Sequence, residues 1–283
     1  MTFLVSTPSS DAAHRPDGYT FAPGDVVPNA LILGCSTVAG EIEGDAPALR
    51  VAFVDDDEAQ FTAEGDPIPE AEPDLAEVLV YTAKVTQLVR ITSEQFAQTN
   101  TATQLSESVA RALTRRANTA FVAEPAPVAP AAAPSAGLVE TAGIIDGGAL
   151  VDSLDVLTDL VALLQDNLAV PSAILVDPLG WGELRKLKVG TSYNQTLLGA
   201  GTSDAEQRLL GLPVIVDPAV PDYTGLVVDQ RAVVSAVGPI KVATSEHEYF
   251  SSDSVLLRAT WRFGHVVVRP NRIGKFSIVE PGS

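Results

Sequence analysis

The sequence places ten carboxylates, and no Lys or Arg, between Asp55 and Glu77. Side chains of this type could bind a metal ion, fill a solvated spacer, or lie against a neighbouring molecule. A calcium loop of the EF-hand type needs oxygen ligands at alternate positions, Gly at position 6 and Glu at position 12. Counted from Asp55, the sixth residue is Gln60, the twelfth is Asp66, and Ala59 takes a ligand position. The spacing therefore predicts no metal site in this stretch.

The other residues that could do chemistry form no catalytic pattern. His14, His247 and His265 are the only histidines, and the chain has no HExxH, GxSxG, Walker or dinucleotide-binding motif. His247 lies between two Glu residues in SEHEYF and is expected to be a surface strand residue. Cys35, the single cysteine, allows no intrachain disulfide, fits a reducing compartment, and is expected to be a small buried residue. The sequence thus predicts no catalytic residue, no cofactor and no metal, and a soluble acidic enzyme stays only as an alternative.

Charge and composition narrow the class of protein further. The net charge is −18, and residues 41–80 hold thirteen acidic residues against one base, Arg50. Sequence-specific DNA binding is disfavoured, because contact with phosphates needs a basic footprint. Aromatic residues make up only 6% of the chain, so the core is expected to consist mainly of Val, Leu, Ala and Ile. The chain has no apolar run long enough for a membrane span and no secretory signal at its N-terminus, so no membrane contact is predicted.

The segments on either side of the acidic stretch determine how it is held in the fold. VAFV (51–54) enters the stretch and VLVYTAKV (78–85) leaves it, and both are rich in β-branched and aromatic residues. This pattern predicts a long β-hairpin with an acidic tip. Two strands alone are marginally stable in water, so the hairpin must lie on something else. The first 50 residues, rich in Pro, Gly, Ser and Asp, are predicted to form an extended arm.

A long helix is predicted after the hairpin, over Thr103–Phe121. Its apolar residues recur at intervals of four: Leu105, Val109, Leu113, Ala117 and Phe121. The densest basic patch of the chain, Arg111, Arg115 and Arg116, lies away from this apolar row. The patch is either a solvated helix face or a surface that receives acidic groups from another subunit. In the second case each exposed pair would add only about 0.2–1 kcal/mol, and so would set register more than strength.

Helical and strand-like segments alternate in the second half of the chain. Four prolines in Glu124–Gly137 predict an extended linker before them. The predicted elements are a helix at Leu154–Leu168 capped by Asp152 or Ser153, a buried strand in Ser172–Pro178, a helix at Trp181–Lys188, a polar loop at 190–201, and a strand-rich tail from Ser254. This alternation predicts an α+β fold with two strand-rich regions separated by a mixed segment.

In this order the segments resemble the major capsid proteins of tailed bacteriophages, which have the Hong Kong 97-type capsid fold. The resemblance runs from Val51 to Val279, and the order and spacing of its pieces are specific. KVTQLVRITSEQF (84–96) is similar to the strand that leads to the family's long spine helix, and AILVDPLGWGELRKLK (173–188) to its strand, turn and Trp-containing helix. LLGLPVIVDPAVP (209–221) and YFSSDSVLLRATWRFGHVVVRP (249–270) resemble its leucine–glycine–proline strand entry and its closing strands.

The resemblance implies a layout for the whole chain. Its segments are an N-terminal arm (1–50), an extended loop that overlaps a neighbouring subunit (51–82), a peripheral domain with the spine helix (83–123) and its return strands (245–283), a Pro-rich junction (124–137) and an axial domain (138–244). The residues predicted to lie at the subunit interface are Asp55, Asp56, Asp57, Glu58, Glu64, Asp66, Glu70, Arg111, Arg115 and Arg116.

The function implied by the resemblance is assembly. The chain is expected to form the pentamers and hexamers of an icosahedral shell that encloses double-stranded DNA without reading its sequence. The virion is its expected location, after assembly in the host bacterial cytoplasm, with scaffolding, portal and decoration proteins as further partners. The alternative is an encapsulin-like nanocompartment, which has the same fold and holds a cargo enzyme instead of a genome.

Two departures from the family pattern change these expectations. Some family members join their subunits covalently through a Lys in the extended loop, but residues 51–83 contain no Lys here. The resemblance therefore implies noncovalent cohesion between subunits. No long charged helical region precedes the arm, so a separate scaffolding protein is expected in place of a fused scaffold domain.

Overall fold

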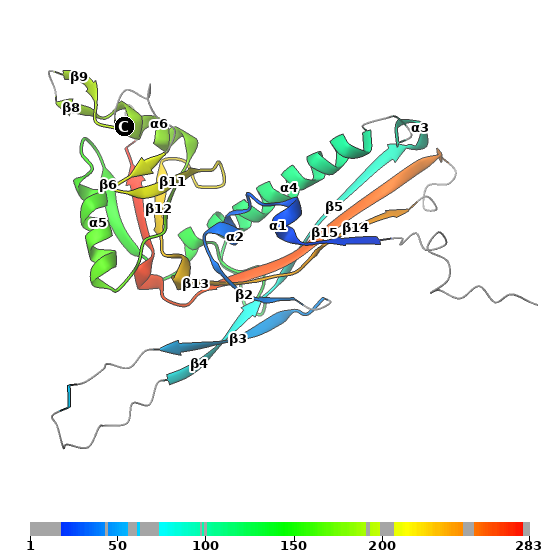
Figure 1. Cartoon of the computed structure of the whole chain (residues 1–283), viewed down its shortest axis with the longest axis horizontal. Coiled ribbons are helices and arrows are strands. Elements are labelled where there is room, and N and C mark those ends of the chain that lie inside the picture. The colour runs from blue at the N-terminus through cyan, green and yellow to red at the C-terminus, as the bar shows by residue number, and fades with distance from the viewer. Residues whose placement is uncertain are drawn as a thin grey trace, which may run out of the picture.

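Strand pairing divides the protein between two six-stranded sheets, one in an elongated part and one in a smaller part (Figure 1). The structure, a computed structural model, describes residues 18–42, 45–55, 61–62, 74–96, 98, 101–190, 193–198, 207–245 and 252–279. Helices pack against both sheets, so the predicted α+β class is confirmed. No helix in these ranges combines the length and the apolar character needed to span a bilayer.

The first sheet is built around one long strand. Its strands are β1 (Gly18–Phe21), β14 (Ile240–Ser245), β15 (Ser254–Val267), β13 (Val233–Val237), β2 (Thr37–Glu41) and β5 (Ala83–Thr92). β15 pairs antiparallel with β5, β13 and β14, and the pairing with β5 runs over ten residues. Strand residues alternate between the two faces of a sheet, so alternate residues of β15, among them Trp261 and Phe263, face the same core.

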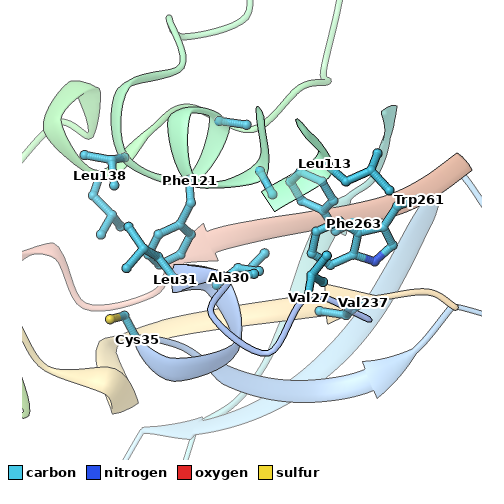
Figure 2. Packing of buried hydrophobic residues seen from close by; sticks show 14 of the residues in the cluster. Val27, Ala30, Leu31, Cys35, Leu113, Phe121, Leu138, Val237, Trp261 and Phe263 are labelled. Atoms are coloured by element: carbon cyan, nitrogen blue, oxygen red, sulfur yellow. The ribbon is translucent and has the colours of Figure 1, made fainter. Parts of the chain in front are cut away.

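The long helix α4 (Thr101–Ala123) lies along one face of this sheet (Figure 1). The row of apolar residues predicted for it is in the core: Val109, Leu113, Ala117 and Phe121 are buried and Leu105 is partly buried. Figure 2 shows Leu113 near Trp261 and Phe263, which come from the facing side of β15, and Phe121 farther along the same cluster, near Leu31. Most buried residues of this cluster are aliphatic, as the composition predicts.

The N-terminal segment differs from the predicted extended arm. β1 pairs with β14, β2 pairs with β13, and the short helices α1 (Pro23–Val26) and α2 (Leu31–Gly34) lie between them in the chain. Leu31 and Cys35 are buried near Phe121 (Figure 2). Residues 18–42 are therefore part of the core of the subunit, because their few apolar residues find partners on α4 and β13 that the local composition does not indicate. Residues 1–17 lie outside the described ranges.

The second sheet forms the core of the smaller part. Its strands, in order, are β10 (Arg208–Leu209), β11 (Leu212–Val216), β7 (Ala173–Val176), β12 (Thr224–Val228), β16 (Gly274–Ile278) and β6 (Ile145–Leu150). The helices α5 (Asp155–Asp166) and α6 (Pro178–Lys186) pack against it through Leu157, Leu160, Leu164 and Leu184. The predicted strand at β7 is confirmed, and all four of its residues are buried.

Three local details of the smaller part differ from the prediction. The cap of α5 is Leu154, with no side-chain hydrogen bond, and not Asp152 or Ser153. α6 begins three residues early, because the buried Asp177 carboxylate accepts hydrogen bonds from Leu179 N and Gly180 N, and Pro178 is favoured at a first helical position. The predicted loop at 190–201 contains a small hairpin of β8 (Lys188–Gly190) and β9 (Tyr193–Thr196).

The predicted segment boundary at residue 244 does not coincide with the division of strands between the sheets. β13 and β14 precede the boundary, yet they pair with β15 in the first sheet. β16 follows the boundary, yet it pairs with β12 and β6 in the second sheet. Strand propensity is a local property, whereas the choice of pairing partner is made by tertiary contacts, so the sequence pattern could not assign these strands.

A buried polar contact joins the two parts. Asn118 of α4 accepts a hydrogen bond from Leu31 N–H at 2.9 Å and donates one to Asp217, just after β11, at 2.7 Å. A buried side chain that satisfies both a donor and an acceptor in this way fixes the position of three segments. The remaining short elements are α3 (Ser93–Phe96), η2 (Leu138–Glu140), η3 (Gln230–Ala232) and η5 (Pro270–Arg272).

Candidate subunit interface

The predicted hairpin is formed by β3 (Ala48–Asp55) and β4 (Asp74–Tyr81), which pair antiparallel over their full length. Asp55, the first residue of the predicted interface, ends β3 and is the register partner of Asp74. The tip between them falls largely outside the described residues, including the predicted interface residues Asp56, Asp57, Glu58, Glu64, Asp66 and Glu70. Of the described pairs, Arg50 and Glu77 lie across the hairpin at 3.4 Å and are both exposed.

The base of the hairpin is fixed to the first sheet. Val80 is fully buried in a small cluster with Ile42, Val234 and Ala236. Thr82, the residue between β4 and β5, donates a hydrogen bond to Ala46 O at 2.7 Å. These contacts anchor β4 on the sheet face that is opposite to α4, because Val234 and Ala236 are not in the cluster that contacts α4.

Substituting Gly264 with alanine is expected to weaken the packing between the base of the hairpin and β15. A Cβ at Gly264 would lie 2.0 Å from Tyr81 O, and a backbone atom cannot rotate away. We expect a loss of about 1–3 kcal/mol in the free energy of unfolding, measured by urea denaturation of unassembled subunits. Gly182→Ala in α6 is the control: nothing lies within 4 Å of its Cβ, so stability should stay equal or rise. Equal stability of the Gly264→Ala variant and the wild type would show that β4 does not pack closely against β15 at this position.

The direction of the hairpin follows from the chain path. β4 continues into β5 with only Thr82 between them, so β3 and β4 run away from the sheet (Figure 1). At about 3.3 Å per residue, strands of this length extend roughly 25 Å. The far ends of the two strands, Asp55 and Asp74, therefore lie well away from the start of β5.

Arg111, Arg115 and Arg116 of α4, which we call the helix patch, were predicted to bind acidic groups of another subunit. Two of the three already form ion pairs within their own subunit. Arg111 pairs with Glu107 at 3.6 Å, and both are exposed. Arg116 makes two hydrogen bonds with Glu124, at 2.6 and 2.9 Å, and this contact raises the pKa of the arginine. Arg115 is exposed and forms no ion pair within the described ranges. The Arg111–Glu107 pair is visible in the sequence from its spacing, but Glu124 follows the helix and its role required the structure.

A pocket of about 480 Å³ lies between the C-terminal half of α4, β5 and β15. His265 of β15 lines it together with Arg116, Glu124 and Ser135. The imidazole is 4.9 Å from the Phe121 ring, and its Nε2 atom is buried without a hydrogen-bond partner in the described structure. Burial lowers the pKa of His265 to about 4, against an opposing hydrogen bond with the Ala136 backbone. No sequence pattern indicated this site, because its residues come from four separate segments of the chain.

The free energy of unfolding of unassembled subunits is expected to fall as the pH decreases from 6.5 to about 4. The pKa of His265 is about 4 in the folded state against 6.5 for an ordinary histidine, so the unfolded chain binds the proton more tightly in this window. The contribution is fully present above pH 6.5 and is lost progressively below it, up to about 3 kcal/mol. Urea denaturation across this window should give a steeper decrease for the wild type than for His265→Gln. Parallel pH profiles would contradict a buried, neutral His265.

The structure shows a second basic surface, which sequence reasoning missed. Residues directly opposite in an antiparallel pair share a face, and Trp261 and Phe263 place alternate residues of β15 in the core beneath α4. The other residues of the strands face away from α4, and we call this side the open sheet face. Its basic residues are Lys84 and Arg90 of β5, Lys241 of β14, and Arg258 and Arg262 of β15. In the sequence, basic and apolar residues are interspersed in KVTQLVR (84–90) and LRATWR (257–262). Only the strand register shows that the basic residues of the two segments lie on the same face.

Of the other residues with possible chemistry, the structure describes Cys35. Cys35 is buried, as predicted, and burial raises the pKa of its thiol to about 12, so it is not a nucleophile at neutral pH. His14 and His247 lie outside the described residues. Within the ranges that the structure describes, no three His, Cys, Asp or Glu side chains cluster as metal ligands would.

Comparisons with known proteins agree with this architecture. A family model described as "Phage capsid family" matches residues 37–278. A chain of Gordonia phage Cozz is similar with a TM-score of 0.66 and 16% identity, over 89% of this chain and 87% of that chain. The capsid of a native GTA particle is similar with a TM-score of 0.66 and 15% identity, over 99% and 96%. A chain of Mycobacterium phage Adephagia has a TM-score of 0.65 and 13% identity, over 99% and 100%. No sequence among the curated proteins matches significantly.

Proposed function

The chain belongs to the phage capsid family, whose members are structural proteins and not enzymes, and from this premise we propose how it builds a shell. As the major capsid protein, it forms the pentamers and hexamers of an icosahedral shell that encloses the double-stranded DNA genome of a tailed phage. The hairpin of β3 and β4 is the observation that best supports assembly. It is anchored at its base and extends away from its own sheet.

The hairpin is an intersubunit arm in this proposal. A two-stranded hairpin is marginally stable in water, so its outer part needs a surface to cover. Phe61, in the loop, is fully exposed in the single subunit, as expected for a residue that packs on a partner. Arms of this type reach the contact area of a permanent assembly, upward of about 2,000 Å², by covering a neighbour.

Charge and packing hold the arm, without a covalent bond. Residues 51–83 contain no Lys that could form an isopeptide crosslink. The acidic groups of the loop would instead pair with basic groups of the adjacent subunit, and Arg115 of the helix patch is one candidate. The net charge of −18 also disfavours tight binding of the shell to packaged DNA, because like charge suppresses contacts with phosphates.

The cellular setting follows from the same proposal. The subunits assemble in the cytoplasm of the host bacterium and end in the virion. Scaffolding, portal and decoration proteins are its candidate partners in this assembly.

Electron microscopy of the purified protein tests this function. The chain, expressed alone and with the scaffolding protein of its own genome, is expected to give capsomers and closed shells of uniform size. A chain that stays monomeric in both conditions, at every concentration tried, would contradict the proposal.

A further inference from the structure

We propose that Tyr19 and Phe21 of one subunit, which we call the aromatic pair, pack into the pocket beside the C-terminal half of α4 in an adjacent subunit. This inference rests on the proposed function. It names a contact between two copies of the chain that does not involve the hairpin of β3 and β4.

The first argument is that the aromatic pair is exposed in its own subunit. Tyr19 and Phe21 lie on β1, are 53% and 42% exposed, and stack with their ring centroids 6.4 Å apart. An aromatic side chain buries roughly 150–250 Å² when it is covered, so two neighbouring rings leave a large apolar area in water. An exposed apolar patch of this kind is typical of a surface that contacts another molecule.

The second argument is the size and lining of the pocket. Its volume of about 480 Å³ falls within the range of sites that bind small molecules, roughly 300–1,000 Å³, so aromatic side chains can enter it. Val85, Ala120 and Phe263 contribute apolar lining, and Arg116 and Glu124 contribute polar lining. Tyrosine suits this combination, because its ring is apolar and its hydroxyl is polar. Arginine also binds favourably to the face of an aromatic ring.

The third argument is that the aromatic pair and the pocket lie on the same face of the first sheet. The register partners of the pair are Ile240 and Val242 of β14, and directly opposite residues share a face. Ile240 belongs to the core cluster that includes α4, and Val242 packs against this cluster. The aromatic pair is therefore on the α4 side of the sheet, where the pocket also lies.

The fourth argument is that the aromatic pair and the pocket lie at the same level along the strands, on opposite sides of β15. β1 is the strand beyond β14, and β5 lies on the other side of β15 (Figure 1). Thr20 of β1, which is between the two aromatic residues, is opposite Lys241 of β14, and Lys241 is opposite Thr260 of β15. Thr260 is in turn opposite Thr86 of β5, which lines the pocket.

These positions allow a second copy to dock by a displacement across the sheet, without being turned over. Three antiparallel pairings separate β1 from β5, so the two strands run in opposite directions. A copy placed beside β5 would present its own β1 antiparallel to that strand, with its aromatic pair on the side of the pocket. Head-to-tail contacts of this kind generate rings when the rotation closes.

The occupant of the pocket comes from another copy and not from the same subunit. Within one subunit, β1 is three strand spacings from β5, which is roughly 14 Å. The core residues of β14 and β15 fill the space between them on this face. The aromatic pair therefore cannot enter the pocket of its own subunit.

Removing the aromatic pair tests whether the contact supports assembly. Tyr19→Ser/Phe21→Ser is expected to lower the yield of capsomers and shells about tenfold, measured by sedimentation, because aromatic anchors contribute most to an interface. The subunits should keep the wild-type circular dichroism and unfolding midpoint, since both side chains are exposed. Val128→Ser is the matched control: its side chain is 82% exposed in the linker, and the yield should stay within about twofold of the wild type.

Cysteine pairs test the position of the contact. Subunits with Tyr19→Cys are assembled together with subunits that carry Ala83→Cys in the pocket lining, and are treated with a short bifunctional thiol reagent. Cys35 is buried and does not compete. The mixture is expected to give at least about tenfold more covalent dimer than either variant assembled alone, because a thiol links only to one within its reach. Leu88→Cys, on the opposite face of β5, is the control and should give no dimer with Tyr19→Cys.

Each contrary outcome overturns a defined statement. Wild-type yield from Tyr19→Ser/Phe21→Ser, or a dimer that forms equally with Leu88→Cys, would refute the pocket as the receptor of the aromatic pair. Assembled particles that give no dimer between Tyr19→Cys and Ala83→Cys would refute the inference and leave the proposed function intact. Failure of the wild-type chain to form any particle would refute the proposed function as well, so the two failures are distinguishable.

Discussion

Replacing residues 56–73 with an Asn-Gly turn is expected to abolish shell formation while the subunit still folds. Asp55 and Asp74 are register partners, so a two-residue turn can join the strands without a change of register. The base of the hairpin keeps its buried contacts at Val80, so the free energy of unfolding should change by less than about 0.5 kcal/mol. The loss falls on assembly, because the shortened arm can no longer reach a neighbour.

Electron microscopy and sedimentation of the shortened protein measure this effect. A loop of unchanged length, with every Asp and Glu of residues 56–73 changed to Asn or Gln, is the control that separates reach from charge. It should assemble in part, and it should lose the salt dependence of the wild type. Wild-type yields from the shortened hairpin would show that the arm is dispensable.

Replacing Trp261 with alanine is expected to lower the free energy of unfolding by about 3–5 kcal/mol. Trp261 is fully buried in the core between α4 and the first sheet, with its ring 4.7 Å from the ring of Phe263 (Figure 2). Its Nε1–H donates a hydrogen bond to Gly238 O at 2.9 Å. Alanine removes the ring packing and the donor together, and the rigid β-sheet around it cannot close the cavity.

Trp261→Phe divides this loss into its two parts. Phenylalanine keeps most of the packing but leaves the buried Gly238 carbonyl unpaired, which should cost about 1–3 kcal/mol. Urea denaturation of unassembled subunits gives both values. A loss below about 1 kcal/mol for Trp261→Ala would mean that this core does not determine the stability of the subunit.

The elements that the sequence predicts well are those set by local periodicity. The apolar residues every four positions, from Leu105 to Phe121, defined α4, and the strand-like flanks of the acidic stretch defined β3 and β4. These signals are properties of short segments, so no tertiary contact was required to interpret them.

The features that were missed depend on contacts between distant segments. β16 joins the second sheet and residues 18–42 enter the core of the first, and neither choice is visible in local propensity. The open sheet face exists only because the register aligns Lys84 with Arg262 and Thr260 with Lys241. The helix patch shows the opposite effect. Its three arginines are close in sequence but differ in their ion pairs, because Glu124, which lies beyond the end of α4, pairs with Arg116.

The most direct test of the account is a cryo-electron microscopy reconstruction of assembled particles. We expect the hairpin of β3 and β4 of each subunit to lie across an adjacent subunit and to contact it. A shell in which every hairpin contacts only its own subunit, or in which neighbours meet without the hairpin, would contradict the account.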